Sequence, residues 1–395
     1  MRILHTSDWH LGRNFGAVPL IDDQRSFLDW LVELCREERV ELVVMAGDVY
    51  DRAIPPAEVV PLCNDAVSRL CANGAQVVVI TGNHDSVDRV IPPYGMLDPA
   101  GAHIRGGYRS IGEVLHLNCS DGPLDVVPLP YLDPQASPDD FAVPAGLKAQ
   151  DSSGATFERR LRRTHQFVLE EAVRAAGANR MVRRSLAVAH AYVVGGLQSD
   201  SERDLAMGGT GAVDARVFDG FSYVALGHLH RPQGLEGREH VRYAGSPLAY
   251  SFSEEQPKSV VLVDMARDGS CRAVEVPIPV GRGVHTVEGL MEDLLARKPS
   301  PAVEASFVRA IVTDPGVVLD ARQRLSAVYP HVVEIELRPA VQGGAHGAAV
   351  IELSKTSAMA AIEAFWLDSL GELPTEGERT LLEQAIAAVQ REEHA

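Results

Sequence analysis

The sequence predicts an α/β fold in which two β-sheets pack together and helices cover them. Three observations lead to this prediction. Short apolar runs alternate with amphipathic stretches over residues 1–130, further apolar runs follow with little helix between them, and the composition is that of a globular protein. The chain has 395 residues, of which 46% are hydrophobic and 23% charged, so it is long enough for two domains and an appendage.

The first part of the chain has a βαβαβ rhythm. We expect strands at Arg2–Thr6, Glu41–Ala46 and Gln76–Thr81, and helices near Asp22–Glu38 and Ala57–Cys71. The runs LVVMAG and VVVITG are apolar on both faces, which is typical of central strands that are covered on both sides. Each run ends in a glycine and a polar cluster, so polar side chains stand at strand carboxyl ends, where open α/β sheets bind their ligands.

The later part of the chain predicts a second sheet. A helix is expected over residues 152–176, and strands are expected at Ser185–Ala189, Phe221–Leu226, Val241–Ala244 and Ser259–Asp264. The two prolines of VEVPIPV (Val274–Val280) indicate an exit from the first domain. We therefore expect one domain over residues 1–275, a small α/β domain over residues 276–345 and a helical segment over residues 354–395, the last two separated by a Gly/Ala-rich loop at Gln342–Ala348.

Composition excludes several classes of protein. No apolar run approaches the roughly 20 residues of a membrane-spanning helix, and a strand-like run starts at the N-terminus, so we expect a cytoplasmic protein with no membrane partner. Five scattered cysteines without CxxC spacing predict reduced thiols rather than a zinc or redox motif. The net charge of −17 argues against a protein that holds nucleic acid by bulk electrostatics alone, although clustered carboxylates also serve as metal ligands.

Five segments place His, Asp or Asn just after an apolar run: Asp8–His10, Gly47–Asp51, Gly82–Asp85, His190 and Gly227–His230. A DxH or HxH spacing at a strand end puts both side chains on one face, within reach of one ion. Taken singly, each residue has an ordinary explanation, because His190 could be a core histidine, Asp8 a helix cap and Asn83 a turn residue. Together they predict a site of imidazole, carboxylate and amide ligands that suits Mn²⁺, Fe²⁺ or Zn²⁺.

This series of motifs (DWH, GDVYD, GNHD, H, GHLH) resembles the five-motif signature of calcineurin-like metallophosphoesterases. Within that superfamily, HTSDWHLG, SERDLAMGGTGAV, YVALGHLHRPQ and YAGSPLAYSFSE resemble the SbcD family of bacterial nuclease subunits. The segment FWLDSLGELPTEGERTLLEQA resembles the region with which such subunits dock on a coiled-coil ATPase. The resemblance implies a sandwich of two packed mixed sheets flanked by helices, a small capping domain that helps to position DNA, and a C-terminal docking segment.

The resemblance also implies roles for individual residues. One metal would be held by Asp8, His10, Asp48 and His230, and the second by Asp48, Asn83, His190 and His228. His84 is similar to the general acid of the family, and Asp51 is placed to orient it, although some relatives have histidine at the position of Asp51. Two divalent ions are implied, Mn²⁺ first, with Mg²⁺, Fe²⁺ and Zn²⁺ left open.

Four polar residues lie in loops next to these motifs, and we expect them to contact the phosphates of a substrate: Arg13, Asn14, Arg89 and Arg231. The alternative is that they form an ordinary solvated surface. Tyr250 and Phe252 are candidates for base stacking or for core packing.

The C-terminal segment has two apolar stripes with helical spacing, one at Ala360, Ile362, Phe365, Trp366 and Leu370, the other at Leu381, Leu382, Ile386 and Val389. Pattern alone allows this helix pair to pack on its own domain. The resemblance favours docking on the coiled coil of an ATPase.

The function implied is that of a two-metal phosphodiesterase that cuts DNA in repair and recombination, as an exonuclease on double-strand ends and an endonuclease on hairpins or blocked ends. The resemblance further implies a homodimer within a heterotetramer. Two alternatives remain open on the sequence: a metallophosphoesterase for a small substrate such as a cyclic nucleotide, and a non-catalytic scaffold. The scaffold predicts a damaged ligand set, whereas every ligand position here holds a competent residue.

Overall fold

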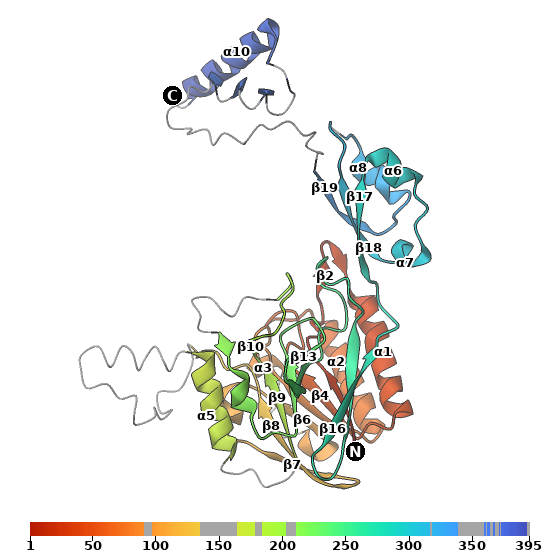
Figure 1. The fold of residues 1–395 in the computed structure, drawn as a ribbon, viewed down its shortest axis with the longest axis vertical. Coiled ribbons are helices and arrows are strands. Elements are labelled where there is room, and N and C mark those ends of the chain that lie inside the picture. The colour runs from red at the N-terminus through yellow and green to blue at the C-terminus, as the bar shows by residue number, and fades with distance from the viewer. Residues whose placement is uncertain are drawn as a thin grey trace, which may run out of the picture. The chain divides into compact units, whose positions relative to one another are not determined.

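A computed structural model describes residues 1–90, 97–134, 164–177, 184–202, 211–316 and 318–338, together with residues 359, 360, 362, 363, 366, 367, 371 and 373–392 (Figure 1). The chain divides into two compact units, Met1–Pro339 and Ala340–Ala395. Part of the predicted helix at residues 152–176, namely residues 152–163, and most of the SERDLAMGGTGAV motif lie outside the described residues.

The first sheet of the larger unit has six strands in the order β16-β15-β1-β4-β5-β6. Its members are β1 (Arg2–Thr6), β4 (Leu42–Ala46), β5 (Gln76–Ile80), β6 (Ala102–Arg105), β15 (Ser259–Met265) and β16 (Cys271–Pro277). β1, β4, β5 and β6 run parallel, with Ile3 opposite Leu42 and Leu42 opposite Gln76, while β15 and β16 are antiparallel. The strands expected at residues 2–6, 41–46 and 76–81 are confirmed. β16 extends to Pro277, two residues past the domain boundary expected from the sequence.

The second sheet also has six strands, in the order β13-β14-β12-β9-β8-β7. Its members are β7 (Leu115–Cys119), β8 (Gly122–Leu129), β9 (Ser185–His190), β12 (Tyr223–Gly227), β13 (Gln233–Leu235) and β14 (Arg238–Tyr243). β8, β9, β12 and β14 are parallel, and β7 and β13 are antiparallel edge strands. The predicted second sheet is therefore present, but the strand expected at residues 259–264 belongs to the first sheet.

The two sheets pack face to face, and helices cover their outer faces (Figure 1). Side chains alternate along the strands. Ile3, Leu42 and Val44 point toward the second sheet, whereas Leu4 and Val43 point toward helices α1 (Ile21–Glu37) and α2 (Val59–Ala72). On the other side, helix α5 (His165–Gly177) covers the second sheet. This four-layer order explains why central strands such as β4 are apolar on both faces, and it confirms the predicted sandwich of two mixed sheets.

His5 is a polar residue in this otherwise apolar interface. Its Nε2 donates to the carbonyl oxygen of Leu226 (3.1 Å), so its Nδ1 accepts from the hydroxyl of Tyr223 (3.1 Å). The imidazole therefore links β1 of the first sheet to β12 of the second. Burial lowers the pKa of His5 to about 3, because a charged ring here would lose its hydration.

A small α/β part follows the sandwich and consists of β17 (Val284–Gly289), α6 (Met291–Ala296), α7 (Pro301–Glu304), β18 (Phe307–Val312), α8 (Ala321–Ser326) and β19 (Val332–Leu337). Its three strands are parallel, in the order β17-β18-β19, and one core of its own lies between them and the helices. Phe307 stacks on Phe15 of the short hairpin β2 (Asn14–Phe15) and β3 (Val18–Pro19), with ring centres 4.6 Å apart. Arg282 donates to Asp23 of α1 (3.1 Å) and lies over the ring of Phe307.

Shorter elements complete the larger unit: α3 (Val87–Val90), the 3₁₀ turns η1 (Asp98–Ala100), η2 (Gly107–Ser110) and η6 (Ala215–Phe218), and the bridge of β10 (Tyr192–Val193) with β11 (Ala212–Val213). All five cysteines are free, as expected. Within the described residues, no helix combines the length and apolar character needed to cross a bilayer.

The smaller unit contains helix α10 (Glu376–Glu392). Its start is a capping box, in which the backbone N–H of Thr375 donates to the Glu378 carboxylate (2.8 Å) and the N–H of Glu378 donates to the Thr375 hydroxyl (3.4 Å). Arg379 pairs with Glu363 at 3.0 Å, which ties α10 to the preceding helical residues.

We predict that His5→Gln weakens the acid sensitivity of folding. The pKa of His5 is about 3 in the folded chain and about 6.5 when unfolded, so the unfolded state binds more protons between these values. The stability contributed by the neutral ring is complete above pH 6.5 and is lost as the pH falls toward 3. Urea unfolding between pH 7 and pH 4.5 should show a slope of free energy against pH that is smaller in the variant by up to about 1.4 kcal/mol per pH unit. Equal slopes in both proteins would contradict this account.

Candidate metal centre

Parallel strands from both sheets end at one edge of the sandwich. The residues that follow them are Asp8 and His10 after β1, Asp48 after β4, Asn83 and His84 after β5, His190 at the end of β9, and His228 and His230 after β12. Segments that are far apart in the sequence meet here because parallel strands present their carboxyl ends to the same edge.

Unusual backbone conformations concentrate in the same loops. Among the described residues, six that are not glycine have a positive φ, and four of these are Asp8, His10, Asp48 and His228 (53°, 42°, 52° and 102°). Side-chain-bearing residues rarely adopt this region, and such strain is typical of functional sites. Backbone hydrogen bonds from Asp8 N to Gly47 O and from His10 N to Asp48 O, each 3.0 Å long, join the loops after β1 and β4.

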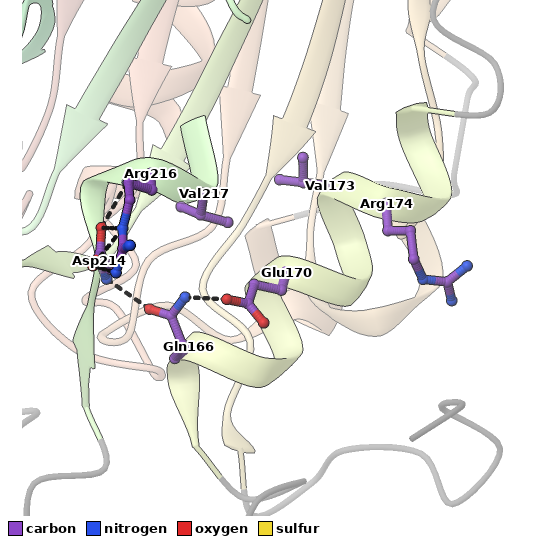
Figure 2. Close-up of a pocket in the computed structure, with 7 residues that line it drawn as sticks. All are labelled: Gln166, Glu170, Val173, Arg174, Asp214, Arg216 and Val217. Atoms are coloured by element: carbon purple, nitrogen blue, oxygen red, sulfur yellow. Dashed lines mark hydrogen bonds and ion pairs between the residues drawn. The ribbon is translucent and has the colours of Figure 1, made fainter. Parts of the chain in front are cut away.

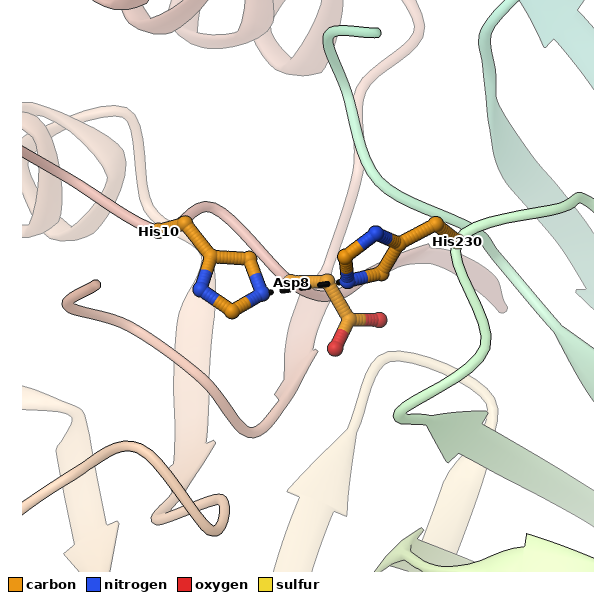
Figure 3. Close-up of side chains that lie close together, drawn as sticks. All are labelled: Asp8, His10 and His230. Carbon is orange, nitrogen blue, oxygen red and sulfur yellow. Dashed lines mark hydrogen bonds between the residues drawn. The ribbon is translucent and has the colours of Figure 1, made fainter. Parts of the chain in front are cut away.

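Asp8, His10 and His230 form one cluster (Figure 3). The Nε2 atoms of the two histidines lie 3.1 Å apart, and the Asp8 carboxylate is directed to the space beside them. All three side chains are buried. At this distance a proton or a cation lies between the two imidazole nitrogens. With the Asp8 carboxylate beside them, the three side chains form a group that could hold a metal ion.

Asp48 lies between this cluster and a second one. Its Oδ2 is 3.6 Å from His10 Nε2 and 3.5 Å from His190 Nε2. His190 Nε2 is also 2.8 Å from the amide oxygen of Asn83, and the ring of His228 lies beside that of His190, with centres 5.5 Å apart. All seven residues expected to bind metal therefore converge, and Asp48 has contacts on both sides, as a bridging ligand requires.

The electrostatics of the site fit divalent cations. Burial lowers the pKa of His190 to about 4 and the pKa of His10 and His228 well below the usual value. Burial and the nearby Asp48 charge raise the pKa of Asp8. His228 Nε2 is buried and has no hydrogen-bond partner within the described part of the chain. Neutral imidazoles beside mutually repelling carboxylates are stabilised by a divalent cation, and a donor set of nitrogen and oxygen without thiolate suits Mn²⁺, Fe²⁺ or Zn²⁺.

His84 stands next to these candidate ligands. Its backbone N–H donates to Asp48 Oδ1 (2.8 Å), its Nδ1 donates to the carbonyl oxygen of Asp51 (2.7 Å), and its Nε2 lies 3.9 Å from Asp48 Oδ2. The resemblance implied that Asp51 orients His84, and the contact between the two residues runs through the Asp51 backbone carbonyl. The Asp51 carboxylate instead approaches Arg13 (3.4 Å) and Arg52 (3.7 Å).

Asp85 holds the loops after β4 and β5 together, a role that the sequence analysis missed. Its carboxylate accepts from the backbone N–H groups of Val49 (3.1 Å), Tyr50 (3.0 Å) and Gly82 (2.8 Å). Burial and the Asp48 charge raise the pKa of Asp85 to about 6. Its place two residues after Asn83 in the GNHD motif was the available signal, but its partners could be recognised only from the fold.

An open pocket of about 560 Å³ adjoins His84 and is lined by Arg13, Asn14, Gly16, Asp51, Arg52, His84 and Ser201. Two of the residues expected to contact substrate, Arg13 and Asn14, are therefore beside the site. Arg231 is exposed and is not part of this lining, and the side chain of Arg89 lies outside the described residues. Arg52, which is 60% exposed, also lines the pocket and was not identified from the sequence.

Tyr250 and Phe252 are both buried, which agrees with the core-packing alternative rather than with base stacking. The Tyr250 hydroxyl donates to the carbonyl oxygen of Trp9 (2.6 Å), and the Arg13 guanidinium lies 4.7 Å from the Tyr250 ring centre. Tyr250 therefore supports the loop of Asp8 and His10 from behind and helps to hold Arg13.

A second pocket, of about 520 Å³, lies between α5 and η6 (Figure 2). Its lining includes Gln166, Glu170, Asp214 and Arg216, which are linked by hydrogen bonds in two pairs and by the contact of Gln166 with the backbone of Asp214. None of the residues expected to bind metal or substrate lines it.

Comparison with known proteins agrees with this geometry. The family model for calcineurin-like phosphoesterases matches residues 1–232. The SbcD component of the nuclease SbcCD from Bacillus subtilis is 38% identical over 271 residues, which cover 67% of this chain and 66% of that protein, just under two thirds of its length. A solved structure, GAP50, the anchor in the inner membrane complex of Plasmodium, is 11% identical with a TM-score of 0.38, and covers 88% of this chain and 99% of that one. The last likeness is too loose to carry an argument.

We predict that Gly82→Ala weakens metal binding without unfolding the chain. A Cβ at Gly82 would overlap the carboxylate oxygen and the backbone nitrogen of Asp48, so the central candidate ligand must move. We expect Mn²⁺ affinity to fall at least about ten-fold, measured by calorimetric titration, with an unchanged circular dichroism spectrum. Gly177→Ala is the matched control, because a Cβ there meets no atom within 4 Å. Wild-type affinity in Gly82→Ala would exclude a metal site at Asp48.

Proposed function

The chain belongs to the calcineurin-like phosphoesterase family, and from this premise we propose that it is a metal-dependent nuclease that cuts DNA. It acts as the nuclease subunit of an SbcCD-type complex, as an exonuclease on double-strand ends and as an endonuclease on hairpins or blocked ends. Its proposed setting is DNA repair and recombination in the cytoplasm.

The observation that carries this proposal is the convergence on Asp48 of nitrogen and oxygen donors from both sheets, seven residues in all when Asp48 itself is included. A scaffold without catalysis has no need of such a set. The likeness to a nuclease subunit over 271 residues supports DNA, rather than a small molecule, as the substrate.

The residues that would hold two divalent ions, Mn²⁺ in our proposal, are Asp8, His10, Asp48 and His230 for one, and Asp48, Asn83, His190 and His228 for the other. Ions at these positions supply the positive charge that polarises a phosphodiester and lowers the pKa of water. The chain's own proton carrier is His84. Because His84 Nδ1 keeps its proton on the Asp51 carbonyl oxygen, Nε2 is the nitrogen that takes up and gives away the second proton. In the imidazolium form His84 delivers that proton from Nε2 to the leaving oxygen and returns to the neutral ring.

Substrate phosphates are bound locally rather than by the overall charge of −17. Arg13 is held by Asp51, by the carbonyl oxygen of Ser201 (3.3 Å) and by Tyr250, so its guanidinium is fixed at the pocket. Arg52 is largely exposed beside it. Guanidinium groups bind phosphate in bidentate fashion, and we propose that this pair, with Asn14, guides a DNA strand toward His84. Residues 276–345 form the proposed capping domain, which helps to position the duplex.

The C-terminal residues 354–395 are the proposed docking segment for an SbcC-type coiled-coil ATPase, within a heterotetramer that contains a homodimer of this chain. The large apolar residues that are exposed in the described part of this unit are Leu367, Leu373 and Leu381, the last 66% exposed. Exposed leucines on and next to a capped helix support helix-in-groove contact with a partner.

We expect Mn²⁺-dependent cleavage of hairpin and blunt-ended duplex DNA, and none after chelation with EDTA. The assay should compare these DNA substrates with cyclic nucleotides at equal enzyme concentration. Rapid cyclic-nucleotide turnover with intact DNA would reverse the choice of substrate.

Replacement of His84 by Gln should reduce cleavage by a factor of about 10² to 10⁴, because the amide cannot transfer a proton. The variant should keep the metal content of the wild type, measured by mass spectrometry of the bound metal. Undiminished cleavage would remove His84 from the mechanism.

Truncation after Leu353 should abolish association with the ATPase, measured by co-purification and light scattering, while metal content stays unchanged. Leu381→Asp in the full chain should weaken association, because it places a charge on an apolar contact. The matched control is Leu319→Asp, at a leucine of the capping part that is 73% exposed. Full association of the truncated chain would refute the docking segment.

A further inference from the structure

We propose that Glu254 and Lys258, outside the ligand set, are positioning residues for His230, and that this buried pair sustains only one of the two metal sites. The inference rests on the proposed function, because it assigns the pair a role toward His230 as a ligand. The two residues lie in the segment between β14 and β15 and follow the SPLAY sequence that supports the loop after β1.

The pair is buried at the level of the core. Glu254 is 1% exposed, and its Oε2 forms an ion pair with the ammonium group of Lys258, whose side chain is 9% exposed. Isolated charges are costly to bury, so removal of one partner leaves the other uncompensated. The Lys258 ammonium also donates to the carbonyl oxygen of His230 (3.1 Å) and to the hydroxyl of Ser246 (2.9 Å). Lys258 therefore holds the main chain of His230 directly.

The other carboxylate oxygen acts on the ring of the same histidine. Ser201 Oγ lies 2.5 Å from His230 Nδ1 and donates to Glu254 Oε1, which itself is 3.6 Å from His230 Nδ1. Because the serine proton points to the carboxylate, the serine oxygen accepts from His230 Nδ1–H. The backbone N–H of His230 donates to the Glu202 carboxylate (2.7 Å), so the N–H, the carbonyl oxygen and the ring of His230 each have a hydrogen-bond partner.

The consequence is a defined tautomer. With the proton held on Nδ1, Nε2 of His230 is unprotonated and faces His10 Nε2 and Asp8, as a ligand of the first cluster must. The corresponding histidine of the second cluster is oriented differently, because His190 Nδ1 donates to the backbone carbonyl of Ala46 (2.9 Å). A side-chain change can therefore disturb His230 while leaving the support of His190 intact.

The experiment is a calorimetric titration of the full chain with Mn²⁺ alone. We expect two binding events in the wild type. In Glu254→Gln, which keeps the shape of the side chain and removes its charge, one affinity should fall ten- to a hundred-fold and the other should stay within two-fold. Ser201→Ala removes only the relay between the ring and the carboxylate and should weaken the same event, and it spares the buried ion pair if Glu254→Gln folds poorly.

Asp121→Asn is the matched control, because it breaks the ion pair between Asp121 and the buried Arg184. Neither residue of this pair is a candidate metal ligand. It should lower the thermal stability and leave both affinities unchanged. Two unchanged affinities in Glu254→Gln and Ser201→Ala would overturn the inference, and so would an equal loss at both sites, which indicates general damage. A wild-type chain that binds no Mn²⁺ would instead overturn the proposed function.

Discussion

The structure depends on one electrostatic constraint, which is that four imidazoles, two carboxylates and an amide oxygen are brought together in a buried space. Burial alone makes this arrangement unfavourable, because it lowers the pKa of His10, His190 and His228 and raises the pKa of Asp8. Bound divalent cations make the arrangement favourable, because they bind neutral imidazoles and ionised carboxylates. The backbone has a positive φ at Asp8, His10, Asp48 and His228. Such strain persists only where the surrounding structure fixes the conformation of the chain.

The sandwich is what makes such a convergence geometrically possible. Parallel strands of both sheets end at one edge, so each loop has to carry only one or two donors. The two sheets also approach closely there. A Cβ at Gly227 would overlap the carbonyl oxygen of Ala46, which is the atom that orients His190. The carboxyl ends of β4 and β12 can therefore meet only because the last residue of β12, Gly227, has no side chain.

The supports of the site differ in kind, and the difference has functional consequences. His84 and His190 are oriented by the backbone carbonyl groups of Asp51 and Ala46. A substitution at Asp51 or Ala46 changes the side chain and leaves the carbonyl group in place. His230 depends on the side chains of Ser201, Glu254 and Lys258, and the loops after β4 and β5 depend on the carboxylate of Asp85. Residues that a backbone carbonyl orients keep this support when a neighbouring side chain is replaced. Residues that a side-chain network orients lose it, so substitutions in the network test individual parts of the site separately.

Local sequence by itself determined most of the central strands and the helices that cover them, and it placed the polar motifs of the candidate metal centre at strand ends, because apolar periodicity and short polar motifs are encoded within a few neighbouring positions. The assignment of single residues as ligands came from the family resemblance. It did not predict β8, whose Pro123 and Pro128 argue against a strand although β8 lies inside the second sheet. Only the tertiary structure decided that the Asp51 backbone, rather than its carboxylate, contacts His84, and that Asp85, Glu254 and Lys258 support the site. These contacts join segments that are distant in the sequence, and nothing in the pattern around one partner specifies the other.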